Sequence, residues 1–139
     1  MTTNSTTQTT APAALWVNLG YQDAPAALDF LTAAFGFEET ARYTEEGTDK
    51  IVHAELRWPG GGGVMLGSAG AGELGVPPGV GCVYIVLETA DDVDALFTRA
   101  ARAGATTVRS PRDEDYGNHD FVVQDPEGVY WSFGTYAGQ

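Results

Sequence analysis

Two histidines and a glutamate are the residues of this chain best suited to acid–base or metal chemistry. The segment 51–58 (IVHAELRW) alternates apolar and polar residues, a pattern typical of a strand with one buried face. On such a strand His53 and Glu55 stand two residues apart on the same face. They could supply two ligands to a divalent ion, with His119 as a third. Without metal they could act as an acid–base pair, because a neutral imidazole titrates near working pH.

The same pattern also has a structural interpretation, which we favour. His53 and Glu55 could belong to the polar face of a half-buried sheet, with the imidazole hydrogen-bonded and the carboxylate paired with Arg57. The pleat brings residues i and i+2 together whether or not they react, so their proximity says little about catalysis. Ser132 has no visible dedicated base, and the tetraglycine 60–63 lacks the helix and lysine of a phosphate-binding loop.

Composition excludes several classes of function. The 139 residues include 7 Lys+Arg and 19 Asp+Glu, a formal charge of -12, which disfavours nucleic acids and anionic membranes and favours a cationic ligand. The single cysteine, Cys82, rules out an intramolecular disulfide and a Cys-rich zinc site within one chain. No secretory signal and no apolar run of about 18 residues is visible. We expect a cytoplasmic protein that needs no cofactor.

The elements that must position these residues form two similar sets. Residues 1–13 are rich in threonine and are expected to be a disordered tail. A predicted strand over 15–21 is followed by a helix that Asp23 caps and Gly36 ends, and by three more strands up to residue 68. The Gly/Pro-rich stretch 69–79 is the predicted linker.

Residues 80–137 repeat this plan. We predict a strand over 81–88, a helix capped by Asp91 or Asp92, a strand over 105–110, a loop over 110–118, and strands over 119–125 and 129–136. A displacement of 68 residues places Asp23 on Asp91 and Gly36 on Gly104. The chain is therefore predicted to be an internal repeat of βαβββ units.

Three segments carry a family resemblance: YQDAPAALDFLTAAFGFEE (21–39), HAELRW (53–58) and DYGNHDFVVQDPEGVYWSFGTY (115–136). They resemble the vicinal oxygen chelate superfamily, which includes glyoxalase I, extradiol dioxygenases and fosfomycin- and bleomycin-resistance proteins. The chain is most similar to the glyoxalase/bleomycin-resistance branch, over 14–137. The resemblance implies an α+β fold of two tandem βαβββ modules (14–68 and 80–137), with curved sheets around a central cavity and helices outside. It also implies a homodimer.

The resemblance further implies where metal ligands would stand. The first-strand position corresponds to Trp16, and its counterpart in the second module to Cys82 or Tyr84. The last-strand position corresponds to Ser132, and in the first module it falls within 64–66. None of these is a histidine or a carboxylate, so we expect the usual metal site to be lost.

Strand parity then places Trp131 and Phe133 in the core. It also predicts a cavity wall of aromatic and neutral polar groups, suited to a flat organic ligand. Its predicted ligand-binding residues are Trp16, Asn18, His53, Glu55, Arg57, Cys82, Tyr84, Tyr130 and Ser132. The predicted function is metal-free sequestration of an aromatic or cationic molecule, as in drug or antibiotic resistance, with no catalytic residue assigned. The alternatives are a metal-dependent lyase, isomerase or dioxygenase that uses His53 and Glu55, and a metal-free enzyme with His53 as base.

Overall fold

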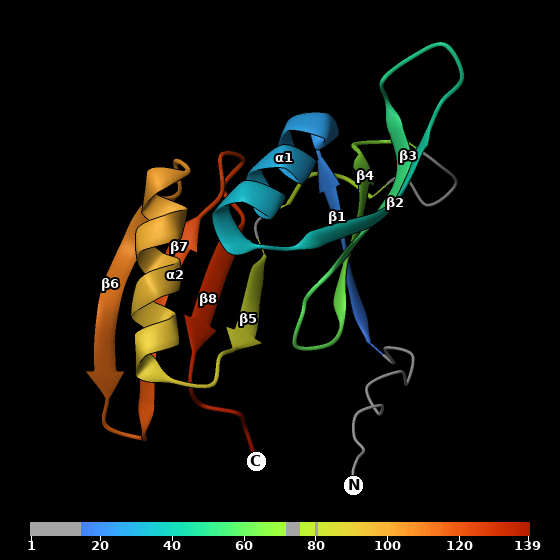
Figure 1. The fold of residues 1–139 in the computed structure, drawn as a ribbon. Helices are drawn as coiled ribbons and strands as arrows, with labels where there is room; N and C mark the ends of the chain where they lie inside the picture. Colours follow the sequence, from blue (N-terminus) through green and yellow to red (C-terminus); the bar gives the residue numbers. More distant parts are fainter. Residues whose placement is uncertain (1–14, 72–75, 80) are drawn as a thin grey trace, which may run out of the picture.

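The two predicted modules are present in the computed structural model, which describes residues 15–71, 76–79 and 81–139. The expected tail 1–13 and part of the expected linker lie outside the described residues. The first module comprises β1 (Trp16–Tyr21), α1 (Ala24–Phe35), β2 (Glu38–Thr44), β3 (Ile51–Arg57) and β4 (Gly63–Ser68) (Figure 1). The second comprises β5 (Cys82–Val86), α2 (Ala90–Arg102), β6 (Thr106–Glu114), β7 (Asn118–Gln124) and β8 (Tyr130–Gly134).

Each module forms one four-stranded mixed sheet, and the two sheets have equivalent strand orders. The first sheet runs β1-β4-β3-β2 and the second β5-β8-β7-β6. In each, the first and last strands of the module pair in parallel and the other pairs are antiparallel. The α+β fold of two βαβββ modules is therefore confirmed, although the sheets do not close into a barrel. Among the described residues, no helix is long and apolar enough to span a bilayer.

The boundaries of α1 follow the predicted signals. The Asp23 carboxylate accepts a hydrogen bond from the backbone N–H of Ala26 at 3.1 Å. Gly36 ends the helix in the left-handed region, at φ 87°, which a glycine adopts without strain. The predicted cap of α2, Asp91 or Asp92, was wrong by two or three residues, because Thr89 is the N-cap. Asp91 and Asp92 lie in the first turn, where their negative charges interact favourably with the helix dipole.

Two strands differ from their predicted patterns. In β3, Ile51 is buried and Val52 is exposed, because the pairing with β2 skips Val52 at a bulge. The strand β6 continues to Glu114, whereas residues 110–118 were predicted to be a loop. A register shift between Arg109 and Arg112 accommodates the intervening proline, which cannot donate a ladder hydrogen bond.

One apolar core joins the two modules. Phe35, at the end of α1, packs against Trp131 and Phe133 on β8, with ring centroids 5.2 and 5.0 Å apart. Trp131 and Phe133 are fully buried, as strand parity predicted. On α2, Arg99 donates hydrogen bonds to the carbonyl oxygens of residues 32 and 33 and thereby satisfies the end of α1.

A buried carboxylate makes the polar part of this junction. Asp125 accepts hydrogen bonds from the Tyr21 hydroxyl at 2.5 Å and the Trp131 indole N–H at 3.0 Å. Its other oxygen accepts the backbone N–H groups of Glu127 and Val129. Burial raises the pKa of Tyr21, and the hydrogen bond to the carboxylate adds to this, so the phenol remains a donor.

Candidate functional site

The open face of the second sheet, away from α2, carries a hollow that is lined mainly by polar and charged side chains. It has a volume of about 520 Å³ and is lined by Cys82, Tyr84, Arg109, Arg112, Glu114, Tyr116, Asn118, Asp120, Val122, Ser132 and Tyr136. We call it the second-sheet hollow. It contains three of the predicted ligand-binding residues: Cys82, Tyr84 and Ser132. Tyr130, a fourth, lies on the neighbouring part of β8, opposite Cys82 in register, and is not part of the lining.

The floor of the second-sheet hollow holds a cluster of opposite charges. The Arg109 guanidinium lies 2.5 Å from Asp120 and 3.2 Å from Glu114, and Arg112 pairs with Glu114 at 3.0 Å. Two buried atoms in the described part of the cluster have no hydrogen-bond partner: Arg109 Nε and Asp120 Oδ1. Because a buried polar group without a partner is costly, such atoms call for an explanation.

The environment acts on the two carboxyl groups in opposite directions. Burial raises the pKa of Asp120, and the neighbouring Glu114 carboxyl raises it further. The hydrogen bond from Arg112 lowers the pKa of Glu114. The Arg112 guanidinium thus stabilises the charged form of Glu114, whereas the charged form of Asp120 is stabilised by Arg109.

Three tyrosines edge the same hollow. The Tyr84 hydroxyl donates to the backbone carbonyl of Tyr136 at 2.7 Å, and partial burial of this hydroxyl raises the pKa of Tyr84. The rings of Tyr116 and Tyr136 meet edge to face, with centroids 5.3 Å apart. The Asn118 side chain joins these groups, because its amide N–H donates to the Tyr116 hydroxyl at 3.1 Å.

The remaining predicted residues lie on the first sheet. His53 Nε2 and Glu55 Oε2 are 2.9 Å apart, and the Tyr43 ring stacks on the imidazole. The predicted pairing of Glu55 with Arg57 was wrong: the carboxylate bonds to His53, and the Arg57 guanidinium lies 5.5 Å from the ring centroid of Trp16. Asn18 is exposed on β1 and lines a separate shallow hollow near Pro77. The predicted wall is thus divided between two sheets.

The prediction that His119 could be a third metal ligand beside His53 and Glu55 was wrong, because His119 lies in the second module. It lies on β7, and both ring nitrogens face carboxylates: Nε2 is 2.8 Å from Asp94 on α2, and Nδ1 is 2.8 Å from Asp113 on β6. The pKa of His119 is raised above its usual value of 6.5. The hydrogen bond to Asp94 contributes most to this shift, and the hydrogen bond to Asp113 contributes next. The imidazolium therefore ties α2 to the second sheet.

This cluster predicts a pH dependence of stability. Since the pKa of His119 is higher in the folded state, its stabilisation is complete below the unfolded pKa of about 6.5 and is lost as pH rises through the folded pKa. We expect the loss in free energy of unfolding caused by His119→Gln to be larger at about pH 6 than at about pH 9. Urea unfolding of both proteins at both pH values measures it. A loss that is independent of pH, or larger in alkali, contradicts the role of the ion pairs.

The most important residues that sequence reasoning missed are Arg109, Asp120 and Asn118. A signal for Asp120 was present, because Asp120 and Val122 alternate with the buried Phe121 in the predicted strand 119–125. The position of Arg109 depends on the bulge in β6, which no periodicity reveals.

Comparison with known proteins identifies the family. Residues 13–133 match the model of the Glyoxalase/Bleomycin resistance protein/Dioxygenase superfamily. The chain belongs to this superfamily. An uncharacterized protein of Mycobacterium tuberculosis is 39% identical over 127 residues, which cover 87% of this chain and 73% of that protein. An uncharacterized protein of Mycobacterium bovis is also 39% identical over 127 residues, which cover 87% of this chain and 82% of that protein.

Solved structures of the superfamily share the fold. TioX from Micromonospora sp. ML1 has a TM-score of 0.72 and 33% identity, with 86% of this chain and 95% of that chain covered. A glyoxalase/bleomycin resistance protein/dioxygenase family enzyme from Burkholderia phytofirmans PsJN has a TM-score of 0.70 and 24% identity, with 86% and 94% covered. The latter likeness establishes the architecture alone.

The positions at which the family resemblance implies metal ligands carry no histidine and no carboxylate. The open-face positions of β1, β4, β5 and β8 carry Trp16, Met65, Cys82, Tyr84 and Ser132. An indole, a thioether and two hydroxyls are poor ligands for a divalent ion. Partial desolvation raises the pKa of the Cys82 thiol, which disfavours the thiolate, although the residue is exposed. Within the described ranges, no group of three or more His, Cys, Asp or Glu side chains could hold a metal ion.

Proposed function

We propose that this superfamily member binds and sequesters a flat organic ligand that carries an aromatic ring and a cationic or hydrogen-bond-donating group, as in drug or antibiotic resistance. The ligand would occupy the second-sheet hollow without a metal ion. The observation that carries the proposal is the buried, unpartnered oxygen of Asp120 in a hollow edged by tyrosines.

Two kinds of interaction support this ligand class. Tyrosine faces attract both flat rings and cations, and Tyr84 and Tyr116 are exposed on the open face. A donor on the ligand would satisfy Asp120 Oδ1 after a small rearrangement of the Arg109 side chain. The formal charge of -12 adds a long-range attraction for cations.

Titration calorimetry with proflavine, a planar aromatic cation, tests the proposal. We expect saturable binding of one molecule per hollow without chemical conversion of the dye. Asp120→Asn should weaken the affinity about fivefold to tenfold, because it removes the charge that faces the ligand. Asp49→Asn, which removes an equal charge from an exposed site on the first module, should leave the affinity unchanged. Absence of saturable binding, or equal effects of the two variants, would contradict it.

We also propose that the protein is a homodimer. The strands β1 and β5 are edge strands of their sheets, and exposed edges and open sheet faces favour self-association. Light scattering during gel filtration should give twice the chain mass of 14.7 kDa. A monomer mass at working concentration would overturn this part of the proposal. Location in the cytoplasm stays a prediction.

One observation favours a second function. His53 and Glu55 form a hydrogen-bonded pair under the Tyr43 ring, and such a pair could serve a metal-dependent lyase, isomerase or dioxygenase of the same superfamily, or a metal-free base. One tightly held divalent ion per chain after mild dialysis, lost in His53→Ala, would favour the metal-dependent enzyme over sequestration.

A further inference from the structure

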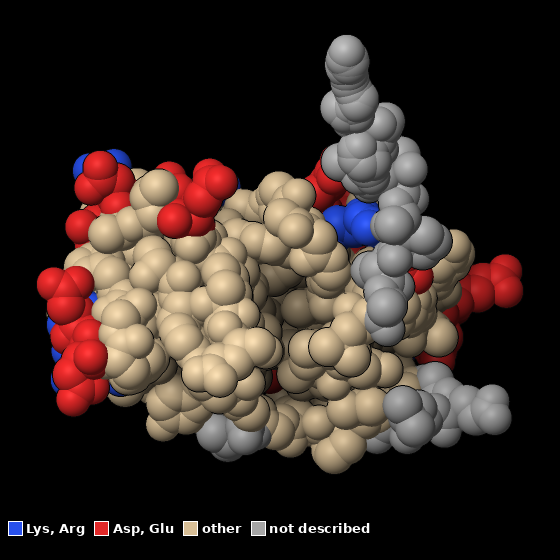
Figure 2. Space-filling model, turned by 90° about the horizontal axis from the view of Figure 1, so that it is seen from below, with Lys and Arg blue, Asp and Glu red and all other residues tan. Residues whose placement is uncertain are grey.

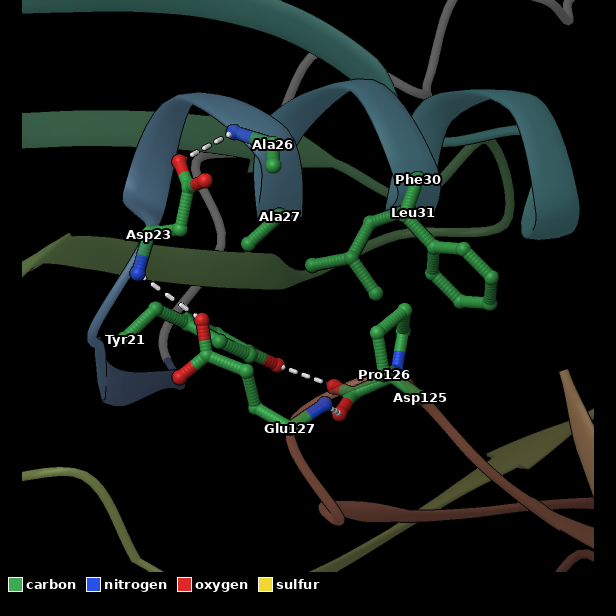
Figure 3. A pocket seen from close by; sticks show the side chains of 9 residues that line it. All are labelled: Tyr21, Asp23, Ala26, Ala27, Phe30, Leu31, Asp125, Pro126 and Glu127. Carbon is green, nitrogen blue, oxygen red and sulfur yellow. Dashed lines mark hydrogen bonds between the residues drawn. The ribbon is translucent and has the colours of Figure 1, made fainter. Parts of the chain in front are cut away.

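A second hollow lies at the junction of the two modules, apart from the second-sheet hollow. It is bounded by the N-terminal half of α1 and by the turn between β7 and β8 (Figure 3). Its volume is about 220 Å³, and its lining residues are Tyr21, Asp23, Ala26, Ala27, Phe30, Leu31, Asp125, Pro126 and Glu127. We call it the junction pocket. Both modules contribute to it, so an occupant would contact both.

The polar groups of the junction pocket already have partners within the protein. The Tyr21 hydroxyl donates to Asp125 (Figure 3). The same carboxylate oxygen also accepts the Trp131 indole N–H. The two oxygens of Glu127 accept the backbone N–H groups of Gln22 and Asp23 at 2.7 and 2.8 Å. An occupant therefore gains little from hydrogen bonds, because each would compete with one already made.

The junction pocket instead offers an apolar wall. The short side chains of Ala26 and Ala27 leave the space open, and Phe30, Leu31 and Pro126 complete the wall (Figure 3). Enclosed cavities with apolar walls take up apolar molecules, and one of about 150 Å³ holds benzene. The junction pocket has a similar wall but is partly open to solvent. The volume here lies between that cavity and the pockets of about 300 Å³ or more that hold drug-sized ligands.

Charge narrows the class of occupant further. Three carboxylates line the junction pocket: those of Asp23 and Glu127, which are more exposed, and the buried one of Asp125. An anionic ligand would be repelled at short range in a partly apolar surrounding. We propose that the junction pocket binds a small uncharged aromatic compound of one or two rings and stabilises the contact between the modules.

Toluene is a suitable probe for this site. In ¹H–¹⁵N spectra of the full chain we expect toluene to shift the backbone signals of the non-proline residues within 21–31 and 125–127. Toluene should also raise the melting temperature, because it binds the folded state. Benzoate, which has the same ring and a negative charge, should produce neither effect at equal concentration.

Two variants and a control make the test specific. Ala26→Leu extends a side chain into the pocket from an exposed helix position and should weaken toluene binding at least about tenfold. Phe30→Ala removes a wall and should also weaken it. Ala33→Leu, at an exposed position of the same helix outside the pocket, should have no effect. Shifts confined to the second-sheet hollow, equal effects of benzoate, or unchanged binding by Ala26→Leu would overturn the proposal. The proposal for the junction pocket does not depend on whether proflavine binds to the second-sheet hollow.

Discussion

Replacement of Asp125 by alanine is expected to lower the free energy of unfolding by about 3–5 kcal/mol. The carboxylate accepts four hydrogen bonds, from the hydroxyl of Tyr21, the indole N–H of Trp131 and the backbone N–H groups of Glu127 and Val129. Alanine would leave these donors without an acceptor, and those of Tyr21 and Trp131 are in fully buried side chains. Because Tyr21 belongs to the first module and Asp125 to the second, the loss also weakens the junction between them.

Urea unfolding of Asp125→Ala and two further variants measures this effect. Tyr21→Phe removes one donor and leaves the carboxylate in place, so it should cost only about 1–2 kcal/mol. Asp49→Ala removes one negative charge from an exposed position and controls for the change in net charge. If Asp125→Ala costs no more than Tyr21→Phe, the carboxylate does not organise the junction.

The fold was predictable because its signals are local and occur twice. Asp23 and Gly36 mark the ends of α1 through cap geometry that depends on a few neighbouring residues. Alternation placed Trp131 and Phe133 in the core correctly. The errors arose where tertiary pairing overrides alternation, as at Val52 in the bulge of β3.

The candidate site was only partly predictable. Parity assigns a face to each residue of a strand, so it placed Tyr84 and Ser132 on the open face. It cannot tell how two sheets of one chain are arranged, and nine residues predicted to share one wall are divided between two sheets. It also assigns no face to Arg109, because the register shift in β6 interrupts the alternation that the prediction depends on.

Conversion of Gly134 to alanine is expected to disrupt the second-sheet hollow. A Cβ atom there would lie 2.5 Å from Asn118 Oδ1 and 2.8 Å from both Asp120 Cβ and the Tyr84 hydroxyl. Asn118 cannot move freely, because its oxygen accepts the backbone N–H groups of residues 135 and 136 at 2.9 and 3.0 Å. Such overpacking costs about 1–3 kcal/mol of stability.

The same substitution should reduce proflavine affinity about a hundredfold, because it displaces Tyr84 and Asp120 together, whereas Asp120→Asn changes one group. Gly81→Ala is the matched control, since a Cβ at Gly81 meets open space and its backbone is not in the left-handed region. Calorimetry and urea unfolding on both variants separate the two effects. If Gly134→Ala loses stability but binds proflavine normally, the ligand lies elsewhere; if it loses neither, the crowding at this glycine is relieved without cost. The first result would remove the second-sheet hollow as the functional site, and the second would contradict the predicted crowding at Gly134.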